Sequence, residues 1–172
     1  MSVTSVHKDP DNLTLTVTAE LDASPERAWQ LWADPRQFER WWGAPGYSTK
    51  TTAFDMRQGG RVEFHLSGPE GDTPNNVWEI LEADQPRLIV LRDAIVDDSD
   101  VPIDEGPSAF TVRFEPTPAG GTRMSIESRF PSAAALKLAL EMDMDKMFEW
   151  AVDKMAVILA EPASLTGSAP ST

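Results

Sequence analysis

The chain has 172 residues, of which 41% are hydrophobic, no cysteine and a formal net charge of -13. This length fits one domain whose core needs no disulfide or metal. The acidic excess excludes nucleic acid and anionic membrane surfaces as expected partners, because binding to polyanions depends on Lys and Arg. No apolar run approaches the roughly 18 residues of a membrane helix, and the N-terminus lacks a secretory signal, so we expect a cytoplasmic protein.

The first predicted elements are a strand and two short helices. In LTLTVTAEL, residues 13–21, apolar and polar residues alternate, which predicts a strand with one buried face. Ser24 is a suitable helix cap and Pro25 suits the first helical position. Asp34 and Pro35 end this helix and begin a second one, which we expect to run to Trp42.

From residue 47 to residue 130 the pattern has a period of two, interrupted by turns that contain glycine or proline. RVEFHL, residues 61–66, and FTVRFE, residues 110–115, each place apolar side chains on one face and polar ones on the other. His65 falls on the polar face, so we assign it to the surface rather than to general-base catalysis. The sequence predicts an antiparallel sheet with one apolar and one wet face.

A single long helix is predicted after the cap Ser132, with residues 135–160 as its body. Its apolar residues recur every three or four positions, so one side should cover the apolar face of the sheet. The last residues, 161–172, are rich in Pro, Ser, Ala and Thr, and we expect a disordered tail. Residues 1–160 should form the single domain.

The order of these elements resembles the START-like (SRPBCC) superfamily, in the branch of homologues of the activator of the 90-kDa heat-shock protein ATPase. The stretches that match cover nearly everything from residue 13 to about residue 160: SPERAWQLWADPRQFERWWGAPGY, FDMRQGGRVEFHL, VWEILEADQPRLIVL, FTVRFEPTPAGGTRMSIESRF and the terminal helix with Trp150. The resemblance implies an α+β helix-grip fold. Its curved antiparallel sheet of about six to seven strands would wrap around the long C-terminal helix, with two short helices after the first strand.

The resemblance also implies a cavity between the sheet and the terminal helix, which in many relatives takes an apolar small molecule. It does not imply one chemistry, because the superfamily includes lipid carriers, hormone receptors, and polyketide cyclases and aromatases. We predict a ligand-binding site lined by Trp42, Tyr47, Phe54, Val62, Phe64, Trp78, Ile80, Phe110, Val112, Met144, Met147 and Phe148.

Two features of this predicted site admit two interpretations each. Trp41 and Trp42 are adjacent, and neighbours on a helix point about 100° apart. Either both indoles pack in the core, or one of them lines a pocket entrance. The methionines of the terminal helix, including Met144 and Met147, either fill gaps in the core or form an adaptable pocket wall.

The sequence lacks the motifs of common catalytic and metal sites. It has no cysteine nucleophile, GxSxG elbow, phosphate-binding glycine loop or His-rich cluster. We therefore predict no catalytic residue, no metal and no cofactor. The acidic residues that follow the strand at 88–91 do not match a calcium-binding loop and are interpreted as a solvated loop that could act as a lid: Asp97, Asp98, Asp100, Asp104 and Glu105.

The leading hypothesis is a non-enzymatic carrier or sensor that binds a hydrophobic small molecule in the cavity. One alternative is an enzyme of the polyketide cyclase/aromatase or hydrolase type acting in the same cavity, which needs an inward His, Asp or Glu with a hydrogen-bonding partner. The other is a chaperone-regulatory domain that binds a protein partner through an exposed apolar patch. The sequence does not distinguish a monomer from a homodimer.

Overall fold

The computed structural model describes residues 3–43, 46–69, 71–72, 76–94 and 109–161. Within this part of the chain there are nine strands and four helices. The strands are β1 (Val3–Asp9), β2 (Thr14–Leu21), β3 (Ser48–Phe54), β4 (Arg61–Gly68), β5 (Gly71–Asp72), β6 (Asn76–Asp84), β7 (Leu88–Ala94), β8 (Ala109–Pro116) and β9 (Thr122–Arg129). The helices are α1 (Pro25–Ala33), α2 (Pro35–Trp41), α3 (Ala133–Glu141) and α4 (Met144–Ala160).

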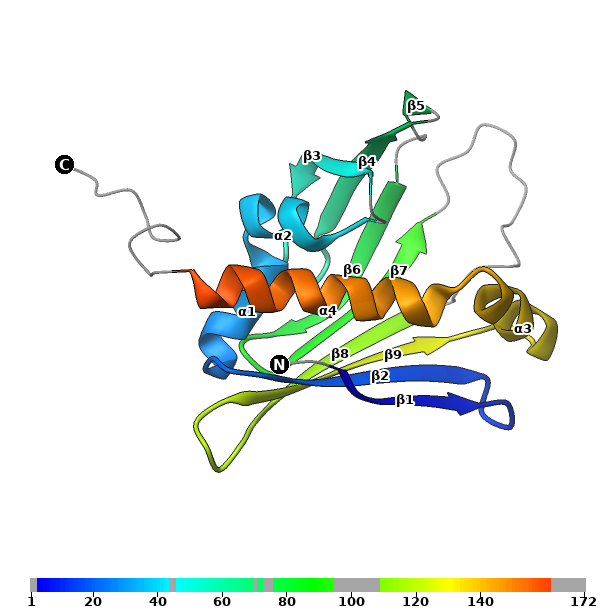
Figure 1. The fold of residues 1–172 in the computed structure, drawn as a ribbon. Coiled ribbons are helices and arrows are strands. Elements are labelled where there is room, and N and C mark those ends of the chain that lie inside the picture. Colours follow the sequence, from blue (N-terminus) through cyan, green and yellow to red (C-terminus); the bar gives the residue numbers. More distant parts are fainter. Residues whose placement is uncertain (1–2, 44–45, 70, 73–75, 95–108, 162–172) are drawn as a thin grey trace.

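The strands form one antiparallel sheet in the order β1-β2-β9-β8-β7-β6-β4-β3, with β5 paired to β4. Helix α4 lies across the face of this sheet, with α1 and α2 toward its C-terminal end and α3 at its N-terminal end (Figure 1). This arrangement confirms the α+β class and the helix-grip fold. Ser24 and Asp34 cap α1 and α2 through their side chains, as the sequence predicts for the boundaries of the two short helices.

The sheet has two strands that the sequence analysis did not identify, so the number of strands exceeds the expected six to seven. Strand β1 is an edge strand paired with β2, which places the two short helices after the second strand. Its sequence VTSVHKD contains only two apolar residues, too few to give a clear period of two. Strand β5 has two residues and pairs antiparallel with the end of β4.

The prediction of one unbroken terminal helix is wrong, because the helix divides at Met142 and Asp143. Asp143 has φ 60° and ψ 35°, a left-handed conformation that ends α3 and redirects the chain into α4. Aspartate tolerates this conformation better than most residues, so neither glycine nor proline is needed at the break. Helix α3 then packs against a separate small core with Leu15 and Phe130.

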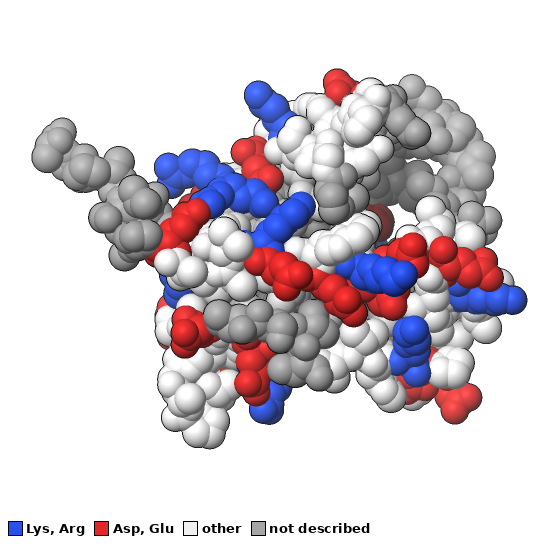
Figure 2. Space-filling view, in the orientation of Figure 1, with Lys and Arg blue, Asp and Glu red and all other residues white. Residues whose placement is uncertain are grey.

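The main core lies between the sheet and the inner sides of α1, α2 and α4. From α4 it includes Phe148, Ala151, Val152, Met155 and Ile158. The outer side of α4 carries acidic and basic side chains close together (Figure 2). This division of α4 into an apolar and a charged side explains why the helix lies on the sheet.

Two predictions fall outside the described residues. The acidic loop with Asp97, Asp98, Asp100, Asp104 and Glu105 lies in the range 95–108, and the predicted tail lies almost wholly in the range 162–172. Both stay predictions.

Candidate functional site

The adjacent indoles of Trp41 and Trp42 lie in different surroundings. Trp41 is the last residue of α2 and is fully buried, with its indole N–H donating to the Leu31 carbonyl oxygen at 2.6 Å. Trp42 is the C-cap, with extended backbone angles, and its ring meets that of Trp41 edge to face with the centroids 5.7 Å apart. Its half-buried ring lies 4.9 Å from Trp78 and 6.0 Å from Phe64, measured between ring centroids.

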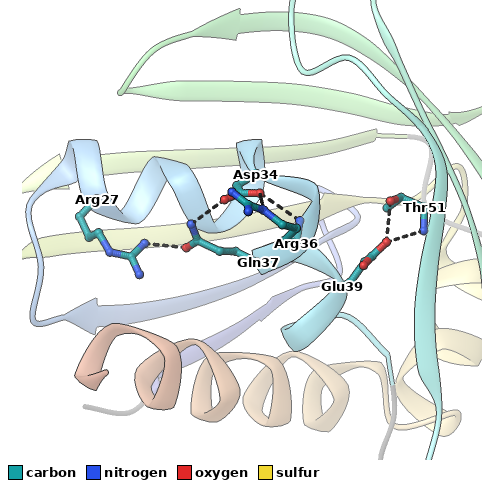
Figure 3. Close-up of polar contacts among 6 residues, drawn as sticks. All are labelled: Arg27, Asp34, Arg36, Gln37, Glu39 and Thr51. Carbon is teal, nitrogen blue, oxygen red and sulfur yellow. Dashed lines mark hydrogen bonds and ion pairs between the residues drawn. The ribbon is translucent and has the colours of Figure 1, made fainter. Parts of the chain in front are cut away.

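Polar contacts hold α2 in the position from which Trp42 reaches the sheet (Figure 3). Gln37 accepts a hydrogen bond from Arg27 of α1 at 2.7 Å and donates to Asp34 at 3.0 Å. At the other side of α2, the Glu39 carboxylate accepts from the backbone N–H and the hydroxyl of Thr51 in β3, at 2.8 and 2.6 Å. These contacts tie α2 to α1 and to β3.

A pocket of about 330 Å³ opens beside Trp42. The end of α2, the loop before β3, the strands β4, β6, β7 and β8, and helix α4 all contribute to its walls. The described lining residues are Trp42, Gly43, Tyr47, Phe64, Leu66, Asn76, Trp78, Asp93, Phe110 and Met147. The pocket therefore combines aromatic and aliphatic walls with one amide and one carboxyl group.

The predicted ligand-binding residues divide between this pocket and the core. The pocket is lined by Trp42, Tyr47, Phe64, Trp78, Phe110 and Met147. The others are packed elsewhere: Val62, Ile80, Val112 and Phe148 are buried in the main core, and Phe54 and Met144 pack against it half-buried. Much of the expected cavity between sheet and helix is thus filled by side chains, and the open space lies at one end of it.

Four lining residues were absent from the predicted site: Gly43, Leu66, Asn76 and Asp93. Leu66 continues the apolar face of β4 after Val62 and Phe64, so the alternation could have included it. Asn76 pairs with Phe64 across β4 and β6, and Asp93 pairs with Trp78 across β6 and β7. Without the register of these strands, nothing in the sequence places either polar residue among aromatic rings.

Asp93 is the carboxyl group that the fold brings into the pocket beside Trp78. Asp93 is exposed as a whole residue, while the protein around its carboxyl group limits the hydration of that group. This desolvation raises the pKa of Asp93 above its usual range, and a hydrogen bond with the Trp78 side chain opposes it by stabilising the carboxylate. The net effect of the two influences is a pKa of Asp93 above its usual range.

The pocket wall between α2 and β3 is held by hydrogen bonds from side chains to backbone carbonyl oxygens and by two close-packed glycines. Gly43 has φ 106°, a conformation that favours glycine, and its carbonyl oxygen accepts from the Lys154 ammonium of α4 at 3.0 Å. The Thr49 hydroxyl donates to the Trp42 carbonyl oxygen at 2.8 Å. Tyr47 packs directly on Gly68, where an added Cβ would lie 2.1 Å from a ring carbon.

No group of three or more His, Cys, Asp or Glu side chains among the described residues could hold a metal ion. None of the helices in the described part of the chain is long and apolar enough to cross a membrane.

Comparisons with known proteins agree with the fold and extend it to a family. A protein from Mycobacterium smegmatis, solved by crystallography, is 35% identical, with 91% of this chain and 97% of that one covered and a TM-score of 0.79. A protein from Arthrobacter aurescens, solved by NMR, is 32% identical over 94% of both chains, with a TM-score of 0.83. An AHSA1-like protein from Aeromonas hydrophila, at 17% identity and a TM-score of 0.65 over 87% of this chain and 96% of its own, shares the fold.

The search of curated proteins gave no match. The family model described as "Activator of Hsp90 ATPase homolog 1-like protein" matches residues 22–160, which span α1 to the end of α4. The chain belongs to this family of START-like proteins.

Proposed function

We propose that the protein binds a small, largely apolar molecule in the pocket beside Trp42 and acts as a carrier or sensor. The observation that carries this proposal is an open space of about 330 Å³ among five aromatic residues, Trp42, Tyr47, Phe64, Trp78 and Phe110. Ligand sites are commonly concave, mostly apolar spaces with a few polar groups that orient the ligand. Asn76 and Asp93 supply those groups here.

The volume limits the size of the ligand. A space of about 330 Å³ is at the lower end of the range for small-molecule sites. Met147, half-buried at the edge of the pocket on α4, can change rotamer and adapt the wall to irregular shapes. A ligand of one or two rings suits the space better than a long lipid chain.

Native mass spectrometry of the freshly purified protein tests the proposal. A bound molecule should appear as an added mass, and denaturing extraction should release it for identification. Met147→Trp should fill the pocket and remove the added mass. Met142→Trp is the matched control, since Met142 is exposed at the α3–α4 junction and does not line the pocket.

Two results would contradict the proposal. One is an absence of added mass combined with no thermal stabilisation by a panel of apolar compounds. The other is an added mass that Met147→Trp leaves unchanged, because the molecule would then occupy another place.

A second candidate function is an enzyme that uses Asp93 as a general acid or base in the same pocket. An inward carboxyl group with a raised pKa and a hydrogen-bonding partner, Trp78, favours this candidate. Incubating the extracted compound with ligand-free protein and following its mass would decide between the two functions. Conversion that is lost in Asp93→Asn would favour the enzyme, and recovery of the unchanged compound would favour the carrier or sensor.

A protein-partner role is the third function that the family allows. The described exposed large hydrophobic residues are Leu81, Met142, Trp150 and Val157. They come from β6, the α3–α4 junction and α4, with Trp150 and Val157 two turns apart on one side of α4. If the purified protein neither carries a bound molecule nor converts one, the exposed side of α4 with Trp150 and Val157 becomes the first surface to test for binding of a protein partner.

A further inference from the structure

We propose that the ligand is an organic ammonium ion, whose positive group lies against the Asp93 carboxylate while its apolar body lies among the aromatic rings of the pocket. The inference rests on the proposed function, since it names the chemical class of the molecule that this pocket binds. It is argued from the rings, from the charges of the lining residues and from the position of Asp93.

The aromatic walls suit a cation. The rings of Trp42, Phe64 and Trp78 meet at steep interplanar angles, 86° for Trp42 and Trp78, 78° for Trp42 and Phe64, and 75° for Phe64 and Trp78. These rings come from the end of α2, from β4 and from β6, so aromatic side chains border the space on more than one side. The face of an aromatic ring carries the negative part of its quadrupole and attracts an organic cation.

The charges around the pocket favour the same ligand. Among the described lining residues Asp93 is the charged group, and the others are aromatic, aliphatic, amide or glycine residues. The nearby ammonium of Lys154 contacts the Gly43 carbonyl oxygen and is not one of the lining groups. The net charge of -13 adds a general attraction for cations over anions.

The position of Asp93 leaves it able to accept from a ligand. It lies opposite Trp78 in the register of β6 and β7, and the Trp78 side chain makes a hydrogen bond with it. A carboxylate offers about four acceptor positions, so one such bond leaves others for the donors of an ammonium group. Its neighbour Arg92 pairs instead with Glu79, so that cation already has its own partner.

The limited hydration of the Asp93 carboxylate explains why it should pair with an ammonium group of the ligand. The protein around the pocket raises the pKa of Asp93, which means that its charge is poorly stabilised when no ligand is bound. An ammonium group placed beside it would stabilise the carboxylate and be stabilised in return. A neutral ligand of the same shape gains at most one hydrogen bond to the carboxylate without the attraction of opposite charges, and an anionic ligand is repelled by it.

Three probes that differ only in their end group test the inference: phenethylamine, phenethyl alcohol and hydrocinnamate. Each carries a phenyl ring on two methylene groups and ends in an ammonium, a hydroxyl or a carboxylate group. We expect the wild-type protein to bind the amine at least roughly tenfold more tightly than the alcohol, and the carboxylate most weakly, by isothermal titration calorimetry at neutral pH. Asp93→Asn, which keeps the size of the side chain, should reduce the preference for the amine to less than about twofold.

Glu82→Gln is the matched control, because it removes an exposed carboxylate from the adjacent strand β6 that does not line the pocket. It should leave the amine preference unchanged, and thermal denaturation should show both variants folded. Equal binding of the amine and the alcohol by the wild-type protein would overturn the inference and leave the proposed function standing. An amine preference that survives in Asp93→Asn would do the same, and so would binding of none of the probes at millimolar concentration; the proposed function is overturned only by the mass-spectrometric results given above.

Discussion

Trp41 and Trp42 lie next to each other in the chain and in different environments, one in the core and one at the pocket. Trp41 is fully buried between Trp32 and Phe38, with ring centroids at 4.5 and 5.2 Å. Trp42 is half-buried and lines open space. The same substitution, tryptophan to alanine, should therefore affect mainly stability at position 41 and mainly ligand binding at position 42.

Trp41→Ala should lower the free energy of unfolding by about 3–5 kcal/mol, because it leaves a large cavity in the core. Trp42→Ala should cost roughly half as much, since part of its ring surface is already exposed. Urea denaturation followed by circular dichroism measures both values. A larger loss for Trp42→Ala than for Trp41→Ala would contradict the assignment of the two rings.

Asp93 gives a prediction about pH. Its pKa is raised in the folded protein, so it favours folding at low pH and this contribution is lost as the pH rises through the folded pKa. The other described lining residues carry no charge near neutral pH, and its chain neighbour Arg92 is paired with Glu79. We therefore expect the ionised Asp93 to lower the stability of the ligand-free protein at neutral pH.

Asp93→Asn should therefore raise the melting temperature of the ligand-free protein at neutral pH. The difference from wild type should shrink as the pH falls and vanish below the ordinary aspartate pKa of about 3.9, where both side chains are neutral. Thermal denaturation across this pH range tests the expectation. A variant that is less stable than wild type at neutral pH would contradict it.

At the scale of elements, the division between α3 and α4 depends on one residue in a left-handed conformation. Asp143 has φ 60°, and its side chain makes no capping hydrogen bond to α4. Its ion pair with Lys146, at 3.4 Å, is exposed on both sides and adds little to stability. Backbone conformation should therefore decide which substitutions are tolerated here.

Asp143→Gly should be more stable than Asp143→Ala by about 1 kcal/mol, because a Cβ disfavours the left-handed conformation. Asp153, an exposed residue inside α4, should show the reverse order by a similar amount, since alanine is the better helix former there. Chemical denaturation of the four variants gives both differences. If the alanine variant is the more stable one at position 143 as well as at position 153, residue 143 has an ordinary helical conformation.

The elements that could be predicted are those whose pattern is local. Ser24, Pro25, Asp34 and Pro35 mark the short helices, and the alternation in β4, β8 and β9 shows which face is buried. The α3–α4 break was missed because apolar residues continue through it at helical spacing, while the conformation of Asp143 has no clear local signal. Strand β1 was missed because an edge strand needs apolar residues on only part of one face.

The site could be predicted only in part, because only some of its residues follow from a local sequence pattern. Aromatic residues on the inner face of the sheet follow from alternation, but which of them line open space depends on how completely α4 fills the cavity. Phe148 and Val112 are in the core, whereas Phe110 lines the pocket. Asp93 enters the site through its register with Trp78, a relation between strands that no single stretch of sequence contains.

At the scale of the whole molecule, the fold places a packed core and an open pocket side by side under one helix. Residues of α4 in contact with the sheet are mostly core, and Met147 reaches the pocket. The exposed side of the same helix carries mixed charges (Figure 2). Binding should therefore change the surroundings of a small group of residues and leave the rest of the molecule unaltered.

The six tryptophans provide the most direct test of this account, because their indole N–H signals can be resolved by NMR. Titration with phenethylamine should shift the signals of Trp42 and Trp78, which line the pocket. The signals of Trp29, Trp32 and Trp150 should stay in place, since these residues lie in the core or on the outer side of α4. Shifts confined to Trp150, or no shift at Trp42 and Trp78 at saturating probe, would contradict a ligand site in this pocket.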